Sequence, residues 1–319
     1  LSRSDLFKDS RLRSVGASAG QARSDLIAFL TALFFLVHPL QTEAVTYISG
    51  RGDVLVTMFM LLALLFFYKS ETTRHALRFS LFALCFLTLG LLSRETAIVF
   101  PVLALAFYVS KFSSRSDLGD SKGRTFLMAV KQGLIKTWPY FAVVVVYGIL
   151  RLTLLNFINT LNFYTESNIY SDNLYIRLFT FLPILWEYLK LLIAPVGLHM
   201  ERSAIVYTSL FQWPVWPIAL VLVGLLWWLR CLYLNENVKL KIKEYNSNFR
   251  IIFFGVSWFF IGLGLVSGIT PINALIYEHW LYLPMIGFWL IVSFYLVKLL
   301  DFQGPTFLKI PAFAPLELR

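Results

Sequence analysis

The stretch VHPLQTEAVTYISGRGD, residues 37–53, determines how the rest of the chain is interpreted. It stands between two apolar runs that can each enter a bilayer, which a helix of ~20 residues crosses. Within it lie His38, Glu43, Arg51 and Asp53. Because ionisable side chains are costly beside hydrocarbon, we interpret this cluster as a candidate functional site at a membrane surface.

The composition of the whole chain is that of a membrane protein. Of its 319 residues, 58% are hydrophobic and 14% are charged, and the mean hydropathy is +0.70. Soluble domains are nearer half apolar and a quarter charged. The apolar residues form runs of about 18 to 22 residues, the length that crosses a bilayer. We therefore predict an all-α fold, a polytopic transmembrane helical bundle.

The net charge of +10 comes from short basic connectors between the apolar runs. These connectors are Arg3 to Arg23, Lys69 to Arg78, Lys111 to Lys136 and Arg230 to Arg250. A nucleic-acid interface needs a folded basic face, and short connectors do not form one. The positive-inside rule explains them as cytoplasmic segments, so we expect no nucleic-acid partner.

Following these connectors along the chain predicts about eight spans. They cover approximately residues 26–37, 54–68, 79–92, 96–110, 138–155, 213–230, 250–270 and 284–299. The segment 174–200 is apolar, but two prolines interrupt it and it carries three charged residues. We interpret it as an external juxtamembrane or re-entrant helical segment.

This topology divides the chain into three parts. Residues 1–25 are expected to be a cytoplasmic loop or tail, residues 26–300 the transmembrane domain, and residues 301–319 a tail. The external polar loops are 38–53, 93–95, 156–212 and 271–283.

The residues that could carry chemistry all fall in these external loops. They are His38, Glu43, Arg51, Asp53, Arg94, Glu95, Glu278, His279 and Tyr282. A helix over residues 41–51 would place Glu43, Tyr47 and Arg51 on one face. A carboxylate there can activate a hydroxyl, and nearby cations can neutralise a leaving phosphate. We take Glu43 and Asp53 as candidate catalytic residues and the other seven as candidate substrate-binding residues.

Structural roles are an open alternative for several of these residues. Arg51 with Asp53, and Arg94 with Glu95, could be ion pairs that anchor helix ends. His38 precedes a proline and could simply end a helix. The spacing of the acidic and histidine residues fits no strong metal motif, so no metal site is predicted.

Four segments resemble one family of enzymes. Residues 38–45 (HPLQTEAV) with 50–53 (GRGD) are similar to the His-Pro-x-x-Thr-Glu-Ala-Val and Gly-Arg-x-Asp signature of GT-C-fold glycosyltransferases. Residues 92–97 (LSRETA), 188–198 (YLKLLIAPVGL) and 278–284 (EHWLYLP) resemble further segments of the same group. The group consists of the transmembrane O-mannosyltransferases that usually carry tetratricopeptide repeats.

The resemblance implies a GT-C-like fold and a transferase that works on a lipid-linked sugar. The donor would be a polyprenyl- or dolichyl-phosphate sugar, with mannose favoured, and the acceptor a hydroxyl such as Ser or Thr of a protein. In such enzymes the lipid phosphate docks among basic residues, a loop carboxylate acts as base, and the anomeric carbon is inverted. No cofactor beyond this donor is implied, and the involvement of a divalent metal stays open.

The chain departs from the family pattern in three ways. The pattern begins with a further span and an acidic loop, which this sequence lacks, and no 34-residue repeat is visible. His279 and Trp280 stand where the pattern has Arg and Tyr. We therefore expect a fragment that is inactive by itself.

Two other functions and two membranes remain open. A transporter or flippase for a lipid-linked substrate, or a non-catalytic membrane scaffold, would also place charges at the bilayer edge. A transporter is expected to show inverted repeats, and none is evident. The absence of any Asn-x-Ser/Thr acceptor favours a bacterial plasma membrane over the endoplasmic reticulum.

Overall fold

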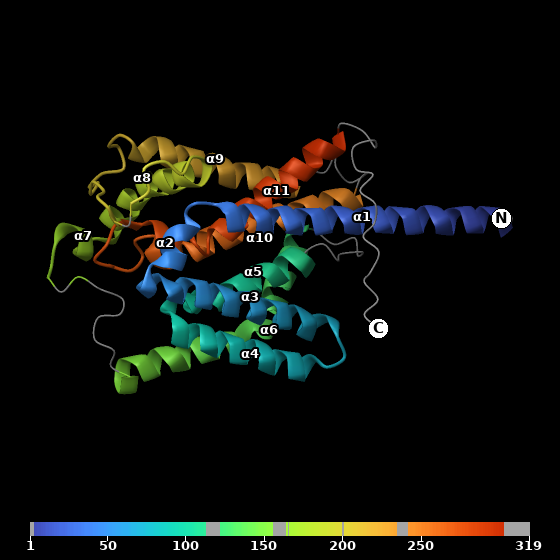
Figure 1. Ribbon diagram of the computed structural model, residues 1–319, viewed down its shortest axis with the longest axis horizontal. Coiled ribbons are helices and arrows are strands. Elements are labelled where there is room, and N and C mark those ends of the chain that lie inside the picture. Colours follow the sequence, from blue (N-terminus) through green and yellow to red (C-terminus); the bar gives the residue numbers. More distant parts are fainter. Residues whose placement is uncertain are drawn as a thin grey trace.

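The computed structural model describes residues 3–112, 122–155, 164, 166–199, 201–234 and 242–302. The long helices are α1 (Arg3–Val37), α3 (Arg51–Thr72), α4 (Ala76–Ser93), α5 (Phe100–Phe112), α6 (Lys122–Leu150), α8 (Leu174–Ile193), α9 (Val215–Leu234), α10 (Ile242–Gly262) and α11 (Met285–Phe302). Most of them run along the long axis of the molecule (Figure 1). The described residues include two strands of two residues each, so the prediction of an all-α helical bundle is confirmed.

Each of the eight expected spans overlaps one of these helices. Four helices are long and apolar enough to cross a membrane, judged by length and composition over the described residues: Gly20–Val37, Arg51–Thr72, Ala76–Ser93 and Phe126–Leu154. Three shorter apolar helices cover Val215–Trp228, Phe249–Gly262 and Met285–Leu300. The polytopic character of the chain is therefore confirmed.

Two local features of the structure could not be read from the sequence. Helix α1 begins at Arg3, within the segment 1–25, and extends well beyond the bundle (Figure 1). The sequence 3–37 contains no proline, and propagating a helix costs less than nucleating one. Residues 41–51 do not form one continuous helix, because α2 (Gln41–Thr46) ends and Tyr47 is extended before the 3₁₀ turn η1 (Ile48–Gly50).

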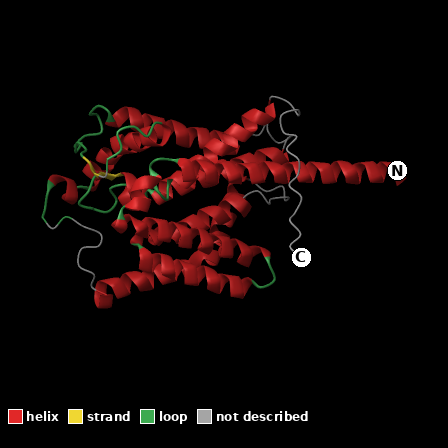
Figure 2. Ribbon diagram, in the orientation of Figure 1, coloured by secondary structure: helices red, strands yellow, loops and turns green. Residues whose placement is uncertain are grey.

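Most described loops gather at one end of the bundle, which we call the loop end (Figure 2). It contains α2 and η1, the 3₁₀ turn η2 (Glu95–Val99), the short helix α7 (Ile169–Asp172), the paired strands β1 (Glu201–Arg202) and β2 (Ile276–Tyr277), and the 3₁₀ turn η6 (Glu278–Leu281). The loops that the sequence placed outside the membrane thus share one end wherever they are described.

Helix α8 lies at this loop end. Near its start, the Arg177 guanidinium donates to the carbonyl of Gly268 at 2.7 Å, just beyond α10. At its other end, the carbonyl of Leu192 lies 3.2 Å from the ring of His38, just beyond α1. Because both ends contact the loop end, α8 fits the expected juxtamembrane segment. Its buried face packs against α10 and α11 in one core cluster.

The crossing of α10 and α11 is close because two glycines meet there. A Cβ atom on Gly255 would lie 2.6 Å from Cγ1 of Ile291, and one on Gly287 would lie 2.9 Å from the nitrogen of Phe259. Small residues let membrane helices approach closely. The indole of Trp258 also donates to the carbonyl of Leu283 at 2.8 Å. These contacts fix where α11 starts, and η6 comes directly before it.

Candidate functional site

Glu43 is held at the loop end by a residue from the other end of the sequence. One carboxylate oxygen, Oε1, lies 2.7 Å from Nδ1 of His279, and Oε2 accepts from the backbone nitrogen of His279 at 2.9 Å. Both side chains are 11% exposed. Glu43 lies in the first turn of α2, where a negative charge is favourable.

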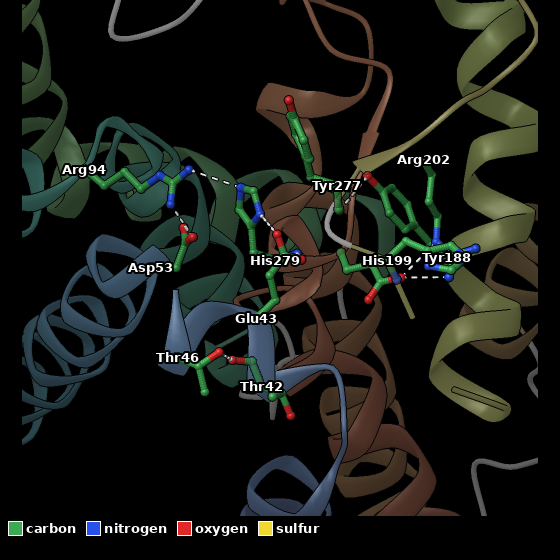
Figure 3. A network of polar contacts seen from close by, with 11 residues as sticks. Thr42, Glu43, Thr46, Asp53, Arg94, Tyr188, His199, Arg202, Tyr277 and His279 are labelled. Atoms are coloured by element: carbon green, nitrogen blue, oxygen red, sulfur yellow. Dashed lines mark hydrogen bonds and ion pairs between the residues drawn. The ribbon is translucent and has the colours of Figure 1, made fainter. Parts of the chain in front are cut away.

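Arg94 continues this chain of contacts to Asp53. Its guanidinium forms an ion pair with Asp53 through Nη1, and its Nη2 lies 3.4 Å from Nε2 of His279 (Figure 3). The start of α3 and the end of α4 lie side by side here, since a Cβ atom on Gly52 would be in ordinary contact with the carbonyl of Ser93, at 3.4 Å. We call Glu43, His279, Arg94 and Asp53 the carboxylate network.

The ion pairs within the site are not those expected from neighbouring residues. Arg94 pairs with Asp53 and not with Glu95, and Glu95 pairs with Arg151 at 2.5 Å. Arg51 is exposed at the start of α3 and belongs to none of the ion pairs of the described residues. The interpretation of Arg51–Asp53 and Arg94–Glu95 as simple helix-end anchors is therefore wrong.

Glu278 anchors a second cluster beside the carboxylate network. Its side chain is 3% exposed, and Oε1 accepts from Arg202 Nε at 2.9 Å, Arg202 Nη2 at 2.7 Å and the His199 nitrogen at 2.7 Å. The hydroxyl of Tyr188 donates to the carbonyl of Tyr277 at 3.3 Å. These contacts join α8, β1 and β2. Since three protein donors engage Oε1 of Glu278 and the side chain is buried, its position indicates a supporting role.

Replacing Glu278 with glutamine is expected to destabilise the fold. Gln keeps an acceptor but loses the charge that Arg202 faces in a buried setting, so we expect a loss of about 2 kcal/mol. Thermal unfolding in detergent measures this. Glu187→Gln is the matched control, because Glu187 pairs with Lys190 on an exposed face and should change stability little. Equal unfolding temperatures for both variants would contradict the assignment.

His38 lies apart from the carboxylate network. Its Nδ1 accepts from the nitrogen of Leu40 at 3.3 Å, and its Nε2 faces the carbonyl of Leu192 at 3.2 Å. The ring is 8% exposed and lies 5.4 Å from that of Trp289. Both ring nitrogens are thus occupied, and His38 connects the end of α1 to the end of α8.

His38 is expected to make the fold sensitive to acid. Burial lowers the pKa of His38 from its ordinary 6.5, an effect that the bond to Leu192 partly opposes. A lowered folded-state pKa means that the unfolded chain binds more protons, so stability is lost as pH falls through about 6.5. In His38→Gln, which can still donate to Leu192, unfolding temperatures should fall less between about pH 7 and about pH 5. His75→Gln, an exposed site at the opposite end, should behave like the parent chain.

Tyr282 is 8% exposed and packs edge-on against Phe35, with ring centroids 5.2 Å apart. Burial raises the pKa of Tyr282, and the charge of Asp53 raises it further. Its hydroxyl therefore stays protonated beside the network. It lies close enough to Asp53 to belong to the same polar region, although no hydrogen bond joins the two.

Sequence reasoning missed Arg151 and Arg202, which pair with two of the predicted site residues. Neither stands in a segment that resembled the enzyme family. In the sequence, each of these arginines is only a single positive charge beside an apolar run, and many other residues of the chain have the same surroundings. Among the described residues, no group of three or more His, Cys, Asp or Glu could hold a metal ion.

Membrane-length helices with an ionisable network at one end define a polytopic membrane protein with a candidate active site. Residues 18–146 match the family described as dolichyl-phosphate-mannose-protein mannosyltransferase. Glu43, Asp53, Arg94 and Glu95 fall within this match, and Glu278 and His279 lie outside it.

Curated relatives carry the corresponding name. The chain is 35% identical over 100 residues to the human protein O-mannosyl-transferase TMTC1 and 37% identical over 101 residues to the mouse protein, in each case 28% of this chain and 11% of the relative. It is 47% identical over 45 residues to protein O-mannosyl-transferase F38B6.6 of Caenorhabditis elegans, 14% of this chain and 6% of that protein. No solved structure matches.

The resemblance to O-mannosyltransferases predicted from the sequence motifs is thus confirmed. The chain matches only about 11% of the length of the first two relatives. All three relatives come from animals, so the comparisons lend no support to the bacterial membrane that the sequence favoured.

Proposed function

We propose that this chain is part of a GT-C-type membrane glycosyltransferase. It would transfer a sugar, with mannose favoured, from a polyprenyl- or dolichyl-phosphate donor to a hydroxyl such as that of a protein Ser or Thr. The observation that carries this proposal is the environment of the Glu43 carboxylate. It is a mostly buried carboxylate at the loop end that is bound by a histidine and by no described guanidinium.

Glu43 is suited to act as the base. Arg94 pairs with Asp53 and Arg151 pairs with Glu95, so the lone pairs of those two carboxylates are engaged by cations. Glu43 can take the proton of an acceptor hydroxyl as that oxygen bonds to the anomeric carbon. The bond from that carbon to the phosphate oxygen breaks at the same time, and the phosphate leaves with the electron pair. Attack opposite the leaving phosphate inverts the anomeric carbon.

The leaving phosphate needs positive charge, and two arginines can supply it. Arg51 is exposed at the start of α3, where the helix dipole also favours an anion. Arg94 is 26% exposed and is fixed by Asp53. We assign Asp53 the task of holding Arg94 in place, which differs from a direct catalytic role. Preorganised cations of this kind stabilise charge that develops in the transition state.

The proposal requires the loop end to face a single aqueous compartment. Residues 26–300 then form the membrane domain, with loops 38–53, 93–95 and 271–283 on the external side. Single cysteines at Thr42, Glu95 and Tyr277, in a background without Cys85 and Cys231, test this with a membrane-impermeant thiol reagent. All three should react from the same side. Labelling of residue 42 from the side opposite to 95 and 277 would remove the proposed site.

The function itself is tested by a transfer assay. The full-length gene product in proteoliposomes receives polyprenyl-phosphate [³H]mannose and a peptide rich in Ser and Thr. We expect label on the peptide hydroxyls, in the inverted configuration. Movement of the intact lipid donor between leaflets without labelled peptide would support the transporter alternative, and neither transfer nor movement would support a scaffold. Either of these results would overturn the proposal.

A further inference from the structure

The ring of His279 bridges the proposed base and an arginine. Its Nδ1 faces Glu43 Oε1 at 2.7 Å, and its Nε2 faces Arg94 Nη2 at 3.4 Å. Figure 3 shows the ring between the two side chains. Tyr277 stacks on the ring, with centroids 5.1 Å apart and planes 25° apart. Contacts with Glu43, Arg94 and Tyr277 therefore fix the orientation of the ring.

These contacts favour one of the two nitrogens as the carrier of the ring hydrogen. A guanidinium has donors only, so Nε2 of His279 must accept from Arg94. The hydrogen then stands on Nδ1 and donates to Glu43. The backbone nitrogen of His279 donates to the other carboxylate oxygen at 2.9 Å. His279 thus fixes both oxygens of Glu43 whenever its ring carries hydrogen on Nδ1.

A second proton on the ring would disrupt this arrangement. It would have to bind to Nε2, which would then direct an N–H group at the donors of Arg94. Two cations would also stand side by side. Arg94 would move away from the ring, and the new positive charge would weaken Glu43 as a proton acceptor.

We propose that His279 is a positioning residue that holds Glu43 through Nδ1–H and, as a neutral ring, holds Arg94 through Nε2, so that proton uptake on Nε2 releases Arg94 and turns the site off in acid. This inference rests on the proposed function of Glu43. The groups that contact the ring are Glu43 from α2, Arg94 after α4 and Tyr277 from β2. The charged and titratable groups next to these are Asp53 from α3, which pairs with Arg94, Tyr188 from α8, which bonds to the Tyr277 carbonyl, and the Glu278–Arg202 pair.

The first test observes the ring directly. The chain, labelled with ¹⁵N-histidine and placed in lipid nanodiscs, contains four histidines, and single His→Gln variants assign their signals. At neutral pH we expect His279 to be neutral with hydrogen on Nδ1. A ring with hydrogen on Nε2, or a doubly protonated ring, would overturn the inference.

Two variants should then move the titration in opposite directions. Arg94→Met removes a cation and frees Nε2, so the doubly protonated ring should appear at higher pH than in the parent. Glu43→Gln removes the facing anion, so the doubly protonated ring should appear at lower pH than in the parent. Identical titrations in both variants and the parent would mean that His279 only packs in the site. The signal of His75, at the opposite end, should not move in either variant.

The second test is the pH profile of transfer. His279→Asn keeps a donor close to Glu43 but has no titrating ring, so its rate should fall and the acid side of its profile should move to lower pH, where protonation of Glu43 alone removes activity. An unchanged acid side would overturn the positioning role. The ¹⁵N measurement of the ring does not depend on sugar transfer, so the two proposals can fail separately. Absence of transfer would overturn the proposed function. A His279 ring with its hydrogen on Nε2 would overturn this inference alone.

Discussion

Sugar transfer by the full-length gene product is expected to fall by about 100-fold or more in Glu43→Gln, the range typical of removing a general base. The amide is nearly the same size as the carboxylate, and its oxygen can still accept from the His279 nitrogen. What it cannot do is take the proton of the acceptor hydroxyl. Radiolabelled mannose incorporated into a Ser/Thr peptide measures the effect.

The design separates catalysis from folding and from donor binding. Glu187→Gln makes the same chemical change on an exposed face of α8 and should leave the rate unchanged. Binding of the lipid-phosphate donor should persist in Glu43→Gln, because the proposed phosphate contacts come from Arg51 and Arg94. Full transfer in Glu43→Gln, with the expected binding, would remove Glu43 from the mechanism.

The helices could be predicted from the sequence because the apolar runs are long and separated by basic connectors. Each expected span overlaps a helix, and α8 lies within the interrupted segment 174–200. The start of α1 could not be predicted in the same way. Residues 3–25 are polar and show no apolar helical pattern. They are helical in the structure because they extend the apolar helix that follows them.

The site was predicted only as a set of residues, and their partners could not be predicted. Glu43 and His279 are 236 positions apart, and Asp53 and Arg94 are 41 apart. Charges that are adjacent in sequence suggested local pairs, but tertiary packing brought the ends of α3 and α4 together and gave Arg94 a different partner. The same packing explains why Glu95 does not pair with its neighbour Arg94: the Glu95 carboxylate forms an ion pair with Arg151, just after α6.

The network depends on a helix crossing that lies outside it. His279 belongs to η6, directly before α11, and the Gly255–Gly287 contact places α11 against α10. A methyl group on Gly287 would collide with the carbonyl of Gly255 and lie 2.9 Å from the nitrogen of Phe259. Backbone atoms cannot yield as a flexible side chain can. The start of α11, and with it His279, would therefore have to move relative to Glu43.

Gly287→Ala is consequently expected to destabilise the bundle by about 3 kcal/mol, the upper part of the usual range for overpacking. Unfolding in mixed micelles with increasing dodecyl sulfate measures this. Gly224→Ala on α9 is the matched control, since its Cβ would meet nothing within 4 Å, and alanine there should stabilise the helix slightly. Because the shift separates His279 from Glu43, transfer should also fall in Gly287→Ala when assayed under conditions where it remains folded. A stable Gly287→Ala protein with normal transfer would show that the α10–α11 crossing does not position the carboxylate network.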